Sequence, residues 1–339
     1  MNRLRYYITA NLSTLFISIF LPLFAIASVI LFIKLATYTA VIQLSVWEMT
    51  KLYIFRLPEI LFYTLPVTFF IAAALSLLKL SNDNEIVVIF ALGIKPSYII
   101  KTLLKPALLL SMVLMLDFFI LFPHATVLSS NFVSYKKSEA KFNLAASEFG
   151  NSFGDWLLYL GKKESDGSFS KVFLFNKKEK EEILIAAKRA KLLNDSGILR
   201  LKLFQGEGYS YSKEKFTQIN FETMLINDTM KTNMRTYKKP LDFWLSNNRA
   251  KEKKQMLITD FLLSIFPIIN LFLVVSLGIV HARHGKSQIY FYLFVSIVLY
   301  YGATIGLQSL LGFYTIPTVI FSWLIVTYTI YRKTILSRF

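Results

Sequence analysis

The stretch KLSNDNEIVVIFALGIKP, residues 79–96, lies between two long apolar runs and is too short to cross a bilayer itself. Asn82 followed three residues later by Glu85 is the pattern of a capping box, which marks the start of a helix. Gly93 followed by Pro96 is typical of a helix end. The stretch therefore predicts a separate short helix between two membrane spans.

The predicted helix covers residues 82–93 and has Ile86, Val87, Ile89 and Phe90 on an apolar face. Its start is acidic and lysines flank it on both sides. An amphipathic helix of this kind is expected to lie on the membrane surface and to insert into a partner. The alternative is a solvated loop that only caps the two neighbouring spans.

The composition is that of an integral membrane protein. The chain has 339 residues, of which 55% are hydrophobic, and several apolar runs are long enough to span a bilayer. It has no cysteine, which excludes disulfides, thiolate chemistry and cysteine-ligated metals. The net charge is +17. Residues 123–255 carry 24 Lys+Arg against 15 Asp+Glu, and the remaining +8 lies mostly at helix ends, where anionic lipid head groups explain it better than nucleic acid does.

Six transmembrane helices are predicted. They cover about 12–36, 57–78, 97–122, 256–280, 289–311 and 314–331. The first run is longer than the apolar part of a signal peptide and is therefore interpreted as a retained span. Six spans place both termini on one side of the membrane, and the short basic loops lie on that same side. The positive-inside rule makes that side cytoplasmic.

The segment between spans three and four has a different character. Residues 123–255 contain short β-type runs separated by turn sequences such as Asp166-Gly167 and 194–197. Closely spaced short strands predict a β-sandwich or jelly roll, on the periplasmic side, since long loops are exempt from the charge rule. The predicted domains are 1–122 with the first three spans and the short helix, 123–255 with the β-domain and a connector, and 256–339 with the last three spans.

The sequence offers no catalytic or nucleotide-binding motif. Residues 285–287, Gly-Lys-Ser, resemble the end of a phosphate-binding loop, but Val280 stands where that loop needs a glycine. His281 and His284 are three residues apart without a nearby carboxylate, which disfavours a metal site. The chain is therefore predicted to be no enzyme and to hold no cofactor or metal.

Few ionisable residues fall inside the predicted spans. Asp117, Asp260 and Lys34 are placed toward the outer interface, which argues against a proton relay through the bilayer centre. Gly302 and Gly306 form a GxxxG pattern that allows close helix approach, either inside the bundle or on a partner.

The order of three spans, a β-domain and three spans resembles the permease subunits of the bacterial lipopolysaccharide exporter, LptF and LptG. The most specific likeness is LPVTFFIAAALSLLKLSNDNEIVVIFALGIKP, residues 65–96. A proline-bearing fourth span followed by Arg283-His-Gly-Lys-Ser287 is similar to the family's basic loop. LptF is the closer of the two, on RYYI at 5–8, LPEI at 57–60 and GEGYSYSKEKFTQINFETMLIN at 206–227.

The resemblance implies a heterodimer with an LptG-like permease in the bacterial inner membrane. An LptB-like ATPase dimer would bind the ATP, and an LptC/LptA-like periplasmic bridge would receive the lipopolysaccharide. The docking residues would be Asp83, Glu85, Ile86, Ile89, Phe90 and Gly93 in the short helix, which becomes a coupling helix. Lys34 would meet the lipid head group, although Thr37 and Thr39 replace expected basic residues. Gly302 and Gly306 would serve a lateral gate or helix packing.

The β-domain is predicted to be a lipid conduit, with Phe204, Phe216 and Phe221 facing inward and Lys202 and Lys215 outward. Alternating strands in a slightly open sandwich would hold acyl chains, but an ordinary packed core explains the same alternation. An alternative function is a membrane-anchored assembly or mechanotransmission factor whose β-domain binds a partner without carrying lipid. Co-purified glycolipid would discriminate between the two.

Overall fold

The computed structural model describes residues 2–39, 44–145, 151–153, 156–164, 166–178, 181–195, 198–212, 215–227, 240–245, 250–279 and 288–337. The chain divides into two compact units. The helical unit comprises Met1–Lys34, Tyr53–Thr126 and Tyr237–Phe339. The second unit comprises Leu35–Leu52 and Val127–Thr236 and contains the sheet.

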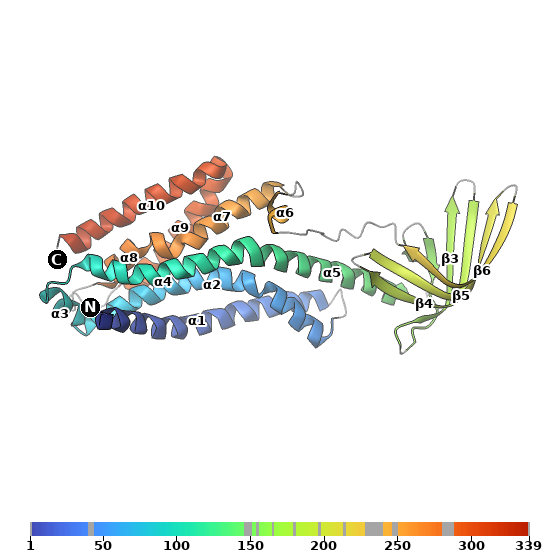
Figure 1. Cartoon of the computed structure of the whole chain (residues 1–339), viewed down its shortest axis with the longest axis horizontal. Helices are drawn as coiled ribbons and strands as arrows, with labels where there is room; N and C mark the ends of the chain where they lie inside the picture. Colours follow the sequence, from blue (N-terminus) through green and yellow to red (C-terminus); the bar gives the residue numbers. More distant parts are fainter. Residues whose placement is uncertain are drawn as a thin grey trace. The chain divides into compact units, whose positions relative to one another are not determined.

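Helices form most of the chain (Figure 1). They are α1 (Asn2–Thr39), α2 (Val46–Asn82), α3 (Glu85–Ala91), α4 (Pro96–Leu116), the π-helix η1 (Asp117–Leu121), α5 (Phe122–Ala145), α6 (Pro240–Leu245), α7 (Ala250–Ile269), α8 (Leu271–Gly278), α9 (Ile289–Leu311), the short 3₁₀ turn η2 (Gly312–Tyr314), α10 (Thr315–Tyr331) and the π-helix η3 (Arg332–Leu336). Figure 1 shows α3 and both chain ends at the same end of the helical unit.

Among the described residues, four helical stretches are long and apolar enough to cross a membrane, or five if the bent pair α7–α8 counts as one span. They are Arg3–Thr37, Val46–Asn82, Pro96–Lys136 and Ile289–Leu336, with α7 and α8 meeting at 45°. A helical membrane protein is confirmed, and the predicted count of six spans is not.

The stretch Ile289–Leu336 folds back on itself. Tyr300 of α9 and Trp323 of α10 have ring centroids 5.2 Å apart. In one straight helix their separation along the chain would span about 35 Å, so the chain reverses between them. The reversal occurs at Gly312, whose φ is +56°, a conformation that glycine adopts without steric cost.

The bend between α7 and α8 has its polar groups satisfied. Pro267 precedes it within α7, and proline removes one helical hydrogen bond. Asn270, fully buried at the break, donates from Nδ2 to the Phe266 carbonyl at 2.9 Å. Its Oδ1 accepts from Trp323 Nε1 at 2.9 Å. The break is therefore an ordered feature of the bundle interior.

The bundle core combines aromatic rings with close helix contacts. The Phe266 ring lies 5.4 Å from that of Phe70 and 4.9 Å from that of Tyr300. At Gly278 the end of α8 meets the end of α2, because the Ser81 hydroxyl donates to the Gly278 carbonyl at 3.1 Å. This contact brings α8 against the part of α2 that leads into α3.

The predicted capping box at the start of the short helix is wrong. α2 continues to Asn82, so this residue ends one helix and does not cap the next. The turn between them contains Asn84 in the left-handed conformation, with φ 60°, directly before Glu85. Asparagine tolerates this conformation better than most residues, so the chain reverses in two residues. At the other end Gly93 has φ +77° and follows the end of α3, as the sequence predicted.

The second unit contains a six-stranded antiparallel sheet in which the described strands pair in sequence order. The strands are β1 (Asn151–Phe153), β2 (Trp156–Tyr159), β3 (Phe169–Lys178), β4 (Glu181–Asp195), β5 (Ile198–Ser212) and β6 (Lys215–Asn227). The β-rich insertion is confirmed, and a jelly-roll order is not, because these strands form a meander. The first part of the segment predicted as β is helical, as α5 runs to Ala145.

A crease crosses the long strands. Lys171, Lys188, Gln205 and Glu222 lie in one row and are left out of the otherwise regular pairing. Two of them have positive φ, 50° at Lys171 and 49° at Gln205. Figure 1 shows the sheet turning between two groups of strand segments. In a regular strand, inward-facing residues are two apart, but across the crease they are three apart, as in Ala187 and Ala190. The same face of the sheet therefore stays inward on both sides of the crease.

Candidate functional site

The α3 loop presents two different faces. Ile86 and Ile89 are only 1% and 7% exposed, and Ile86 belongs to the bundle core. Val88 and Leu92 are 58% and 74% exposed. Because α3 has apolar side chains on both faces, its buried side anchors it in the bundle, and its open side leaves apolar surface available for a partner.

Of the six residues predicted for docking, four are accessible. Asp83 and Gly93 are exposed, and Glu85 and Phe90 are half-buried. Ile86 and Ile89 are buried, and Ile86 lies in the bundle core. The prediction omitted the exposed residues Val87, Val88 and Leu92, and the apolar run itself was the signal that could have found them.

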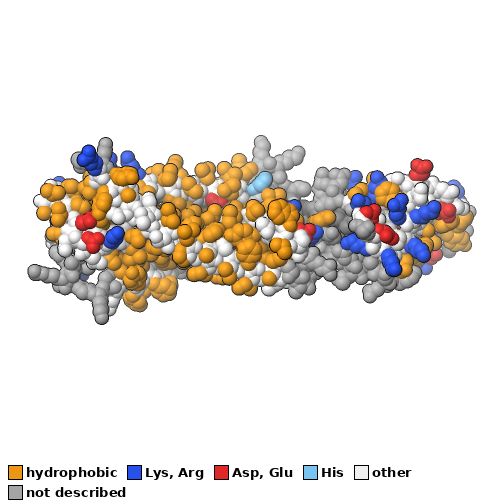
Figure 2. Space-filling view, turned by 90° about the horizontal axis from the view of Figure 1, so that it is seen from below, with side chains coloured by type: hydrophobic (Ala, Val, Ile, Leu, Met, Phe, Trp, Pro, Cys, Tyr) orange, Lys and Arg blue, Asp and Glu red, His pale blue; other side chains and the backbone are white. Residues whose placement is uncertain are grey.

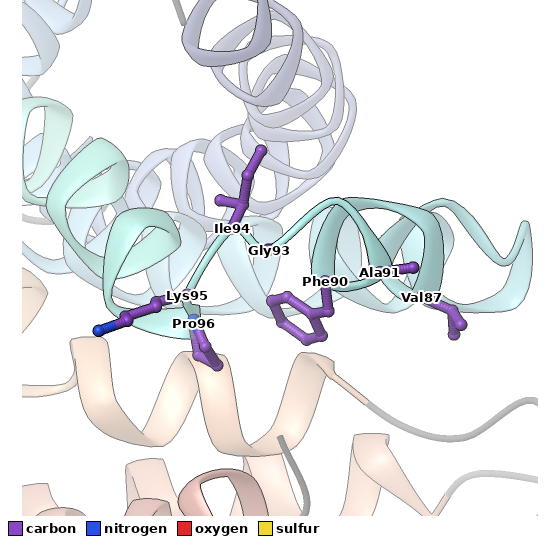
Figure 3. A pocket seen from close by; sticks show the side chains of 7 residues that line it. All are labelled: Val87, Phe90, Ala91, Gly93, Ile94, Lys95 and Pro96. Atoms are coloured by element: carbon purple, nitrogen blue, oxygen red, sulfur yellow. The ribbon is translucent and has the colours of Figure 1, made fainter.

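A shallow pocket of about 360 Å³ lies where α3 turns into α4. It is lined by Val87, Phe90, Ala91, Gly93, Ile94, Lys95 and Pro96 (Figure 3). Figure 3 shows the Phe90 and Pro96 side chains on one side of the loop and Ile94 pointing to the other. Its lining is mainly apolar, which suits it to an apolar side chain of a partner.

Glu85 is held by the first helix. The Tyr7 hydroxyl of α1 donates to the Glu85 carboxylate, with oxygen distances of 2.8 Å to Oε1 and 2.7 Å to Oε2. Nearby, the Arg5 guanidinium lies 5.3 Å from the centroid of the Tyr98 ring in α4. The beginning of α1 thus contacts both α3 and the start of α4.

A second group of polar residues lies inside the helical unit. Asp117 and Asp260 are 6% and 3% exposed, and Asp117 Oδ1 has no hydrogen-bond partner among the described residues. Asp117 begins the π-helix η1, where Trp244 Nε1 of α6 donates to the Phe119 carbonyl at 3.4 Å. π-Helical turns often mark functional positions. Within the described residues no group of three or more His, Asp or Glu side chains is placed to hold a metal ion.

The predicted gate glycines are open. A Cβ added to Gly302 or Gly306 would meet no described atom within 4 Å. The described residues therefore show no close packing of this GxxxG pattern inside the chain's own bundle. Lys34, the predicted head-group residue, is exposed near the end of α1. The apolar surface of the helical unit is visible in Figure 2.

The three phenylalanines predicted for the conduit do not share a face. Phe221 packs against the apolar cluster of the sheet. Phe204 follows the buried Leu203 and lies on the opposite face, beneath the Lys202 ammonium at 5.1 Å from its ring centroid. Phe216 is 62% exposed and stacks on Tyr209.

Electrostatic perturbations in the second unit come from local contacts. Hydrogen bonds from the Ser168 hydroxyl and N–H lower the pKa of Asp166, at 2.5 Å and 3.0 Å respectively. The Tyr209 hydroxyl donates to Glu207, which raises the pKa of the tyrosine. Asp166 thereby stabilises the turn before β3.

The motif residues between α8 and α9 lie outside the described residues. They are His281, Arg283, His284 and 285–287. The predictions made for them, including the basic loop, remain predictions.

The model of the family "Lipopolysaccharide export system permease LptF/LptG" matches residues 6–330. The chain belongs to the LptF/LptG family. It is therefore a multi-pass, non-catalytic membrane subunit of the ABC transporter that exports lipopolysaccharide. The family model covers LptF and LptG together, and no curated protein matches the chain.

Proposed function

We propose that a separate ATPase drives this permease and docks on it through α3. The two faces of α3 carry the proposal, because one is buried in the bundle and the other is exposed and apolar. On this proposal Ile86 and Ile89 transmit force to the core, while Glu85, Val88 and Leu92 contact the ATPase. The pocket beside Phe90 receives an apolar side chain of that partner.

We propose six spans with α3 and both termini in the cytoplasm. The reversal at Gly312 supports counting α9 and α10 separately, so that α1, α2, α4, α7–α8, α9 and α10 each cross once. Basic residues near α3, among them Arg3, Arg5, Lys79 and Lys95, support the orientation through the positive-inside rule. The sheet would then be periplasmic.

We propose that the chain is the LptF-type subunit, paired with an LptG-like permease and an LptB-like ATPase dimer. The open side of α9 at Gly302 and Gly306 would face the second permease or the lipid, and Lys34 would face the phosphorylated head group. The apolar face of the sheet, including Phe221, would take acyl chains and pass them to an LptC/LptA-like bridge. A jelly-roll closure of the meander around those chains belongs to the same proposal.

Charge reversal at Glu85 tests the docking role. Docking through the Glu85 carboxylate requires a basic partner on the ATPase, so Glu85→Lys would bring like charges together, at a cost of about 2 kcal/mol or more. We expect the co-purified ATPase to fall at least tenfold, a smaller loss for Glu85→Gln, and none for the control Glu164→Lys on the second unit. Retention of the ATPase by Glu85→Lys at the level of Glu164→Lys would refute the docking role.

A further inference from the structure

The first helix packs against the bundle along its first half and again near its end. Near its start Ile8 and Leu12 are buried in the bundle core. Near its end Phe32 stacks on Tyr53 of α2, with ring centroids 4.7 Å apart. The exposed apolar side chains between these ends include Ile17, Leu21, Ile26 and Val29. Leu15, Phe16 and Ile19 pack partly against the core. Contacts therefore hold α1 along one side of its first half and again at Phe32.

At the α3 end, the polar contact between α1 and α3 is the hydrogen bond from Tyr7 to Glu85 described above. Tyr7 is 42% exposed, so packing alone does not fix its ring, and the hydroxyl contact is the specific part of the interaction. Its neighbour Tyr6 is 77% exposed. The two adjacent tyrosines thus differ in whether they reach α3.

Glu85 has acceptor capacity beyond this bond. An ionised carboxylate offers about four lone-pair sites, whereas one tyrosine hydroxyl supplies a single donor. A basic side chain of a docked ATPase can therefore bond Glu85 while Tyr7 remains bonded. A displacement of Glu85 would then reach α1 through one hydrogen bond, at the point where α1 is anchored by Ile8.

We propose that Tyr7 is a positioning residue that couples α1 to the docking helix by holding Glu85. The contact of Arg5 with Tyr98 supports this role, because it attaches the same turns of α1 to the beginning of α4. The inference rests on the proposed docking function of α3. It adds a route by which docking or ATP turnover moves a helix whose middle faces lipid or the second permease.

The test uses the complete complex of both permeases and the ATPase, reconstituted in lipid discs. Tyr7→Phe removes only the hydroxyl, and Tyr6→Phe is its matched control. Glu85→Gln and the double variant Tyr7→Phe/Glu85→Gln complete a double-mutant cycle. Four quantities are measured for each: the ATPase retained, the thermal midpoint, and the kcat and KM for ATP, the last two with and without lipopolysaccharide.

We expect Tyr7→Phe to lower the lipopolysaccharide-stimulated kcat about fivefold, as the loss of one exposed hydrogen bond of ordinary strength would. The amount of retained ATPase and the KM for ATP stay within twofold of the wild-type values. The thermal midpoint stays within error of the wild-type value. Tyr6→Phe behaves as the wild type. In the Glu85→Gln background Tyr7→Phe has less than a twofold effect, because the two side chains act as a pair.

Two kinetic results would overturn the inference: a Tyr7→Phe variant as active as Tyr6→Phe, or a full fivefold loss that persists without the Glu85 carboxylate. Failure of the docking proposal is recognised separately, since there Glu85→Lys retains the ATPase. A lowered thermal midpoint in Tyr7→Phe with proportional loss of retained ATPase would show a structural role and would also overturn coupling.

Discussion

Replacing Gly278 by alanine tests how closely α8 must approach α2. An added Cβ would lie 2.6 Å from Leu77 Cβ and 2.7 Å from the Ala74 carbonyl oxygen. Neither neighbour is the end of a flexible side chain, so the two helices must separate. Such overpacking costs about 1–3 kcal/mol. The separation also lengthens the Ser81 hydrogen bond to the Gly278 carbonyl, which is worth about 1 kcal/mol.

The measurement is reversible unfolding of the isolated chain in mixed micelles with increasing dodecyl sulfate, followed by the fluorescence of its four tryptophans. We expect Gly278→Ala to lower the free energy of unfolding by about 2–4 kcal/mol. The control is Gly302→Ala, where the added methyl meets no described atom within 4 Å. Alanine favours the helix, so the control should be as stable as the wild type or slightly more so. Equal stability of the two variants would refute the close packing of α8.

Three further predictions concern other contacts. Gly306→Leu should reduce co-purification of the second permease to half or less and should leave the isolated chain folded, because this side of α9 is open. An unchanged yield of heterodimer would contradict a partner contact there. Trp323→Phe should lower the free energy of unfolding by about 1–3 kcal/mol, because the buried Asn270 Oδ1 loses its hydrogen-bond donor. An unchanged free energy of unfolding in the dodecyl sulfate titration would show that water replaces the indole. A photo-crosslinker at Phe221 should capture lipopolysaccharide in an ATP-dependent way and one at Phe216 should not, whereas equal capture at both would remove the apolar face from the route.

The membrane helices could be predicted where an apolar run ends at a residue with a clear backbone role. The span predicted at 289–311 has the bounds of α9 because Gly312 supplies the reversal that stops it. Where no such residue ends the run, helices continue beyond their apolar part. α5, for example, extends to Ala145, well past the predicted end of the third span at 122. Hydropathy determines the length of a span, and backbone propensity determines the length of the helix.

The crease in the sheet was not predictable from alternation. A period of two assumes that each strand stays straight, whereas Ala187 and Ala190 both face inward across the unpaired Lys188. Several neighbouring strands share this interruption, so it is a property of the sheet. At Gly206 an added Cβ would lie 2.3 Å from the Ala186 carbonyl oxygen, which shows how closely adjacent strands approach there. A single strand's sequence contains no equivalent signal.

The docking residues were only partly predictable, for a related reason. Ile86 through Phe90 are consecutive apolar residues, so the α3 sequence contains no polar side that would tell the buried face from the exposed one. The bundle makes that distinction by burying Ile86 and Ile89 and leaving Val88 exposed. A helix that is apolar all round would aggregate if it were free in water, and it would be inert if it were wholly buried. With one face in the core and one face open, α3 can connect the membrane bundle to a soluble partner.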